Sequence, residues 1–245
     1  MRLKPWLLLP LVWVSAVFAQ GIALPSKETL DYRIEWRLVT AGKAHIDWSA
    51  APRGGWQVGL HLESSGLVSK FYKVQDDYSA ILNQSLCALS SQMTAHEAKR
   101  WRETKITFDG ESKKASYLEQ DRVKNTIVLQ KETDIPSCVH DVVGGLYVLR
   151  TMTLEPGQSG QAPISDGRKS AMVKVEAQQR EEIKVPEGTF KTVRYEVGLF
   201  NNVLYNRSAR LYVWLTDDRR KLPVQIRVRL QVTIGTITLQ LEKHE

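Results

Sequence analysis

The sequence has few cysteines, and they stand far apart. Of its 245 residues only two are cysteine, Cys87 and Cys138. Catalytic redox chemistry prefers a Cys-x-x-Cys pair, so this spacing argues against it. The even number leaves two alternatives, a disulfide formed in an oxidising compartment or two buried free thiols, and we favour the disulfide.

The sequence also lacks the common catalytic signatures. It contains no Gly-x-Ser-x-Gly elbow, Walker loop, dinucleotide fingerprint or His-Glu-x-x-His zinc motif. Its five histidines show no metal-ligand spacing, so we expect no bound metal and no cofactor. They are His45, His61, His96, His140 and His244.

Two acidic motifs could still carry chemistry. His140 and Asp141 could act as a base and its orienting acid, but adjacent residues at a helix start seldom point at each other, and Asp141 suits a helix cap. Asp217 and Asp218 could be paired carboxylates, although in a charged hairpin tip they are better explained as turn formers. We therefore assign no catalytic residue and favour a protein that is not an enzyme.

Long hydrophobic runs are absent beyond residues 1–19, MRLKPWLLLPLVWVSAVFA. Arg2 and Lys4 precede a short apolar stretch, and residues 17–19 supply the small residues of a cleavage site, which together indicate a secretory signal peptide. The stretch is too short for a membrane-spanning helix, and Gln20 in place of cysteine argues against lipidation. We expect residues 20–245 to form a single periplasmic or secreted domain without a membrane span.

The charge is moderately basic, +7 in the full chain and 7 − 2 = +5 once Arg2 and Lys4 are removed. Such an excess either favours anionic partners or serves solubility. An exported protein with no nucleic-acid-binding signature is not expected to bind nucleic acid. The stretch Lys99-Arg100-Trp101-Arg102 could contact an anionic lipid or a sugar, or form a solvated strand face.

Alternation of apolar and polar residues dominates the rest of the chain. Tyr32, Ile34, Trp36 and Leu38 alternate with polar neighbours, a period typical of a strand with one buried face. Ala41-Gly42 is expected to form the following tight turn. Further strands are expected at residues 44–49, 56–62, 72–82, 86–95, 101–108, 114–118, 125–129, 171–176, 182–185, 192–200, 209–215 and 223–241, the last with a bulge or bend at Gly235.

One segment, residues 141–152, has helical periodicity instead. Val142, Leu146, Leu149 and Met152 recur at helical spacing, and Asp141 can cap the helix by accepting backbone N–H bonds. About a dozen strands with this one helix predict an all-β fold. We expect a large curved antiparallel sheet, or a closed or half-closed β-barrel, which the helix covers or plugs.

Three segments resemble, in the same order, a known bacterial family. They are residues 140–150 (HDVVGGLYVLR), 185–190 (VPEGTF) and 214–224 (WLTDDRRKLPV), and Tyr32-Arg33-Ile34 with Ala41-Gly42 fits the first hairpin. The resemblance is to the domain-of-unknown-function family numbered 3108. It implies a β-rich exported protein of the Gram-negative envelope, with no established reaction.

Three functions remain open at this point. We favour a noncatalytic carrier whose concave sheet binds a lipid or glycolipid, because an apolar pocket with few polar groups suits such a ligand. The alternatives are a structural envelope protein with a filled core, whose partners would be other envelope proteins, and a hydrolase of envelope glycan or lipid. The predicted ligand-binding residues are Trp36, Trp56, Tyr147, Arg150, Trp214 and Ile226.

Overall fold

The computed structural model describes residues 24–231 and 235–245, so the predicted signal peptide lies outside the described residues. Within those two ranges no helix is long and apolar enough to cross a bilayer.

The first half of the chain forms an antiparallel meander interrupted by one short helix, α1 (Gly66–Phe71). Each strand pairs with the next along the chain. The strands are β1 (Lys27–Trp36), β2 (Val39–Ala50), β3 (Trp56–Ser64), β4 (Val74–Leu82), β5 (Ala88–Glu97), β6 (Arg100–Asp109), β7 (Lys114–Asp121) and β8 (Thr126–Asp134).

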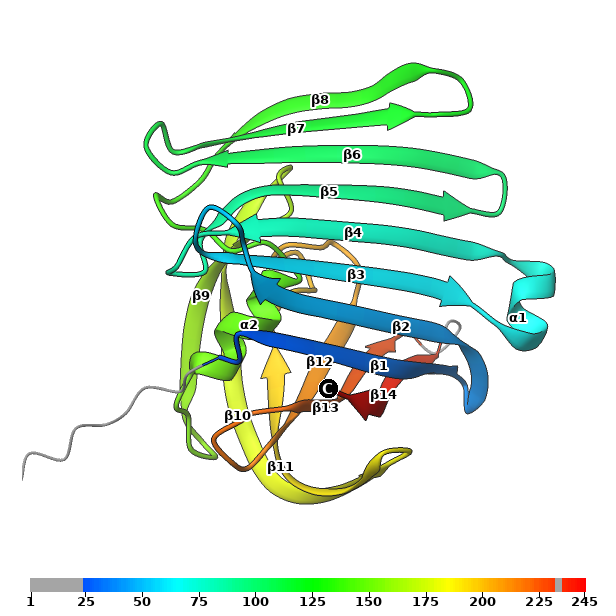
Figure 1. Cartoon of the computed structure of the whole chain (residues 1–245), viewed down its shortest axis with the longest axis vertical. Coiled ribbons are helices and arrows are strands. Elements are labelled where there is room, and N and C mark those ends of the chain that lie inside the picture. Colours follow the sequence, from blue (N-terminus) through cyan, green and yellow to red (C-terminus); the bar gives the residue numbers. More distant parts are fainter. Residues whose placement is uncertain (1–23, 232–234) are drawn as a thin grey trace, which may run out of the picture.

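The second half begins with the helix α2 (Gly144–Thr151) and returns as another meander. Its strands are β9 (Ser159–Ser165), β10 (Ser170–Val185), β11 (Gly188–Val197), β12 (Ala209–Thr216), β13 (Pro223–Leu230) and β14 (Thr236–His244). Because β14 pairs with β1, the halves join into one 14-stranded sheet with β8 and β9 at its edges. The predicted all-β fold is confirmed, as a curved sheet that does not close (Figure 1).

Alternate residues of most strands build the core on the concave face of the sheet, whereas β8 has no buried residue. On β1, Leu30 and Tyr32 are buried, while the intervening Asp31 is partly exposed. The helix α2 packs against this face through Tyr147 and Leu149. The predicted helix is therefore present and covers the concave face, but it is shorter than residues 141–152.

The start of α2 depends on Asp141 and on a close backbone approach. Asp141 Oδ1 accepts hydrogen bonds from the backbone N–H groups of Val143 (3.0 Å) and Gly144 (2.9 Å), as the predicted cap requires. A Cβ on Gly144 would lie 2.4 Å from Asp141 Oδ2 and 3.2 Å from Leu82 Cδ1. Glycine at this position thus lets the helix start sit against the carboxylate and the sheet.

A disulfide ties the segment that precedes α2 to the β4–β5 loop. Cys87 and Cys138 are joined, with an S–S distance of 1.98 Å. The backbone N–H of Ala88 also donates to the carbonyl of Val139 (2.7 Å). The disulfide that the even cysteine number indicated is present in the structure.

Several local predictions were wrong. The first hairpin turns at Arg37 and Leu38, both with positive φ, whereas Ala41 and Gly42 lie within β2. Gly42 instead permits close packing, since a Cβ there would lie 2.2 Å from the carbonyl oxygen of Glu63. Residues 223–241, predicted as one long strand with a bulge or bend, form two strands, because Gly235, at φ 89°, lies in the connection between β13 and β14. The sequence analysis also missed β9 and α1.

Candidate functional site: an apolar cavity and an adjoining polar pocket

A cavity of about 750 Å³ lies between the concave face and α2. Its walls combine residues from both halves of the chain, such as Leu60 and Leu62 of β3 with Val213 and Ile226. The inner side of α2 contributes Leu146. Strand alternation explains most of the lining, since β1–β4 and β9–β14 present mainly alternate side chains to the cavity.

The lining is almost wholly apolar. Glu63, Ser64, Tyr72 and Trp36 supply the only polar side-chain groups among the described lining residues. Trp36 and Tyr72 are 39% and 49% exposed, so the cavity reaches solvent between the β1–β2 hairpin and α1. Figure 1 shows both elements at one end of the sheet and α2 toward the opposite end. We call the exposed end the mouth of the cavity.

A second, polar pocket of about 300 Å³ adjoins the first. Leu60, Leu62, Val142 and Val143 line both spaces, which places the polar pocket beside the start of α2. Its polar side chains come from elements far apart in the sequence. They are Asp76, Tyr78, Ser91, Thr104, Tyr117, Asp141, Ser165, Asp166, Arg168 and Tyr205.

Burial governs the electrostatics of the polar pocket. The Tyr78 hydroxyl donates to Asp141 Oδ1 at 2.6 Å, and burial raises the pKa of both groups. Burial also raises the pKa of Asp76, against the opposing effect of a hydrogen bond from the His96 backbone N–H (2.9 Å). Burial raises the pKa of Tyr205 to about 12. The pocket therefore presents hydroxyl groups beside two carboxyl groups, those of Asp76 and Asp141, whose pKa is raised by burial.

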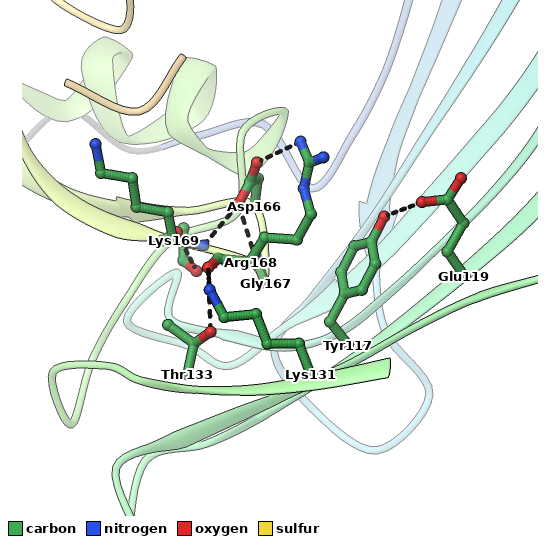
Figure 2. Close-up of polar contacts among 9 residues, drawn as sticks. Tyr117, Glu119, Lys131, Thr133, Asp166, Gly167, Arg168 and Lys169 are labelled. Carbon is green, nitrogen blue, oxygen red and sulfur yellow. Dashed lines mark hydrogen bonds and ion pairs between the residues drawn. The ribbon is translucent and has the colours of Figure 1, made fainter. Parts of the chain in front are cut away.

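The turn between β9 and β10 lines this pocket and contacts β8, the strand at the other edge of the sheet (Figure 2). Asp166 Oδ1 accepts from the backbone N–H groups of Arg168 and Lys169, and Asp166 Oδ2 accepts from Arg168 Nη2 (3.0 Å). On β8, Lys131 Nζ (2.8 Å) and Thr133 Oγ1 (3.1 Å) both donate to the carbonyl of Arg168. These two hydrogen bonds therefore connect β8 to the second half of the sheet.

The predicted ligand-binding residues separate into distinct groups. Trp36 and Ile226 both line the apolar cavity. Trp56, Tyr147 and Arg150 line neither described pocket and belong to a stack on the other side of α2. Tyr147 stacks on Trp48 with centroids 3.8 Å apart, Trp48 stacks on Trp56 (4.9 Å), and Arg150 lies over Tyr147 (5.1 Å).

Trp214 lies on the convex face of the sheet. Val213 lines the cavity, so the next residue along β12 points the other way. The Trp214 indole N–H donates to Glu181 Oε1 at 2.8 Å, and the Arg227 guanidinium lies 5.0 Å from the ring centroid. These contacts bury the indole outside the cavity.

The residues of the two motifs considered for catalysis, His140-Asp141 and Asp217-Asp218, form hydrogen bonds within the fold. His140 Nδ1 lies 2.7 Å from the carbonyl oxygen of Leu86. Asp217 accepts from Arg180 Nε (2.8 Å), and Asp218 accepts from the Thr216 hydroxyl (2.7 Å). No cluster of metal-ligating side chains occurs in the part of the chain that the structure describes.

Sequence reasoning missed the polar pocket. Asp76, Tyr78 and Arg168 stand in strands or turns of ordinary composition, and only the fold brings them together. The one available signal was Asp141, which the helix pattern identified as a cap and which also lines this pocket.

Comparison with known proteins identifies a family and a fold. A family model described as "Protein of unknown function (DUF3108)" matches residues 31–242. No curated protein matches the sequence. The chain is similar to the crystal structure of a beta-barrel-like protein of the domain of unknown function DUF1849 from Brucella abortus, with a TM-score of 0.57 and 8% identity over 91% of this chain and 98% of that chain. This likeness shows the fold alone.

Two further solved structures are less similar. One, from Bacteroides fragilis, is provisionally described as an exported protein with a YmcC-like fold; it has a TM-score of 0.36 and 11% identity over 92% of this chain and 98% of that chain. The other, from Parabacteroides distasonis, is provisionally described as a lipoprotein; it has a TM-score of 0.32 and 9% identity over 92% and 99% of the two chains.

Proposed function

The chain belongs to the DUF3108 family of proteins of unknown function, and from its own geometry we propose that it is a noncatalytic carrier of a lipid in the bacterial envelope. The observation that carries the proposal is the apolar cavity of about 750 Å³. This volume falls within the range of roughly 300–1,000 Å³ usual for small-molecule sites.

The chemistry of the cavity favours an aliphatic ligand. Ordered water needs two to four polar partners, and the lining offers few beyond Glu63 and Ser64 near the mouth. Filling the space with a hydrocarbon chain removes apolar surface from water without leaving a polar group unpaired. An acyl chain meets these requirements.

The adjoining polar pocket favours a hydroxyl-bearing headgroup. Asp76, Asp141 and Asp166 contribute carboxyl groups, whereas the only guanidinium of the lining, that of Arg168, is paired with Asp166. A phosphate would meet more acidic than basic groups there, while sugar hydroxyls could donate to carboxyl oxygens and accept from tyrosine. We therefore favour a glycolipid over a phospholipid.

The alternatives have less support. A structural protein with a filled core would not need a cavity of this size. For a hydrolase, the described residues offer buried acids, but the polar partners of Asp141 are Tyr78 and the backbone of the helix start. The hydrogen bonds to the backbone are those of a helix cap, so they give Asp141 a structural role. The export of the carrier is supported by the leader at residues 1–19 and by the disulfide.

The direct test is mass spectrometry of an organic extract from protein purified natively from its own envelope, with a mock purification alongside. We expect one glycolipid species in stoichiometric amount. An extract that matches the mock would overturn the carrier function.

Two variants of β13 localise the bound lipid. Ile226→Trp fills the cavity from its wall, whereas Arg229→Trp places the same side chain on an exposed position of the same strand. We expect Ile226→Trp to lose the extracted lipid and Arg229→Trp to retain it. Equal retention by both folded variants would place the lipid outside the cavity.

A further inference from the structure

The mouth of the cavity lies at an end of the sheet where several hairpin tips gather. In an antiparallel meander every second connection falls at the same end. The β1–β2 turn, the segment carrying α1, the β5–β6 turn and the β7–β8 turn therefore lie at the same end of the sheet, spread along it, as Figure 1 shows. We call these four connections the mouth face.

The mouth face exposes large apolar side chains at its tips. Leu38, at the β1–β2 turn, is 93% exposed, and Phe71, at the end of α1, is 88% exposed. Leu67 of α1 and Val123 of the β7–β8 turn are also exposed. Leu67 and Phe71 share one short helix, and exposed apolar side chains that lie in a group, unlike those scattered singly, are typical of an interaction site.

Lysines surround these apolar tips. Lys70 and Lys73 flank Phe71, Lys99 lies at the β5–β6 turn and Lys124 at the β7–β8 turn, all exposed. None of these four forms an ion pair with any residue that the structure describes. The mouth face thus combines apolar tips with cations available to an anionic surface.

We propose that the mouth face docks onto a bilayer containing anionic lipid. Apolar side chains that enter the interface and cations that meet lipid headgroups are the two contributions that bind a protein to a membrane surface. Lipid partly withdrawn from that bilayer would meet Trp36 and Tyr72 first, since both line the cavity and reach solvent. Docking would therefore place the cavity mouth directly over the lipid.

A protein partner fits these observations less well. A protein interface is generally depleted of lysine at its core, whereas Lys70 here stands between Leu67 and Phe71 on one helix. The projecting apolar side chains also belong to three separate connections, the β1–β2 turn, α1 and the β7–β8 turn, which suits insertion into a deformable lipid interface.

The test is flotation of the purified protein with vesicles of phosphatidylethanolamine and phosphatidylglycerol. The variant Leu38→Ser/Leu67→Ser/Phe71→Ser removes apolar tips that are exposed, so the fold is retained. We expect vesicle affinity to fall by about tenfold for each side chain removed. Met172→Ser, on β10 outside the mouth face and 51% exposed, is the matched control and should float like the wild type.

Charge is tested separately with Lys70→Glu/Lys73→Glu. We expect this variant to lose most of its preference for phosphatidylglycerol vesicles over vesicles of phosphatidylethanolamine and phosphatidylcholine, and to depend less on salt. Failure of the wild type to float, equal flotation of the triple Ser variant, or equal loss in Met172→Ser would each overturn the proposal.

The outcomes also separate docking from the carrier function on which it builds. The triple Ser variant leaves the cavity wall intact, so it should bind lipid supplied in detergent as the wild type does, while losing flotation. Ile226→Trp should do the reverse. Loss of both properties in either folded variant would contradict the assignment of two distinct surfaces.

Discussion

Arg150 on α2 and Glu28 on β1 form a buried ion pair between residues separated by 122 positions, with Arg150 Nη2 2.8 Å from Glu28 Oε1. The two side chains are 1% and 9% exposed. The Arg150 guanidinium also donates to the carbonyl of Arg220 (3.1 Å) and lies over the Tyr147 ring. It thereby connects the helix, the first strand and the β12–β13 turn.

Removing one partner of this pair should strongly destabilise the protein. Glu28→Gln leaves a buried cation without its counter-charge, so we expect a loss of about 3–5 kcal/mol in the free energy of unfolding, measured by urea denaturation. The double variant Glu28→Leu/Arg150→Met removes both charges and should cost less than Glu28→Gln alone. A loss below about 1 kcal/mol in Glu28→Gln would mean that the pair does not anchor α2.

The disulfide should stabilise the protein by restricting the unfolded chain. Cys87 and Cys138 are separated by 51 positions, a span for which the loop-entropy model predicts about 4 kcal/mol. We expect Cys87→Ser/Cys138→Ser to show this loss in urea denaturation and to be insensitive to reductant. Two free thiols in the denatured, unreduced wild type would contradict the bridge.

Asp141 should make stability depend on pH. Burial raises its pKa above the ordinary value of 3.8, so the folded state holds the proton more tightly than the unfolded state. The free energy of unfolding therefore falls as pH rises from 3.8 through the folded-state pKa, then levels off. Asp141→Asn keeps the Oδ1 acceptor and should show a smaller fall than the wild type, which urea midpoints across the acidic range would measure.

The cap itself is isolated by Asp141→Ala. This change removes the acceptor of the Val143 and Gly144 N–H groups, and we expect a loss of about 1 kcal/mol relative to Asp141→Asn. Equal stability of the two variants at every pH would rule out a capping contribution.

Gly167 should not tolerate a side chain. Its φ is +79°, and a Cβ would lie 2.7 Å from Ile106 Cγ2. We expect Gly167→Ala to cost more than about 1 kcal/mol and to speed amide exchange in residues 166–169, because both strain and crowding act on the turn that latches β8. Gly157→Ala, which also has positive φ but open space around the Cβ, is the control for backbone strain alone.

Most strands could be predicted because each buries one face, which leaves a period of two in the sequence. β9 could not, since Gly160, Ala162 and Ile164 give a weak apolar alternation and its extended form depends on pairing with β10. In the first hairpin, the sequence predicts the turn at Gly42, but the turn is made by Arg37 and Leu38. Gly42 instead allows β2 to approach Glu63 closely.

The cavity could be predicted only in part. Alternation identified Trp36 and Ile226, which line the cavity. For Trp214, the sequence does not show which alternate residues of β12 face the cavity, because large aromatic residues occur on both faces of this sheet. The polar pocket depends on side chains from β4, β5, β6, β7, the start of α2 and two loops. No local pattern records such long-range proximity.

Pairing of β1 with β14 also has a consequence for how the chain acquires its fold. Leu30 lies opposite His244, so the centre of the sheet is formed by segments from nearly opposite ends of the described chain. Contacts of such sequence separation carry a high loop-closure entropy and slow folding. We expect the two meanders to form first as separate partial sheets. The cavity, whose walls come from both meanders, can then form only once β14 has paired with β1.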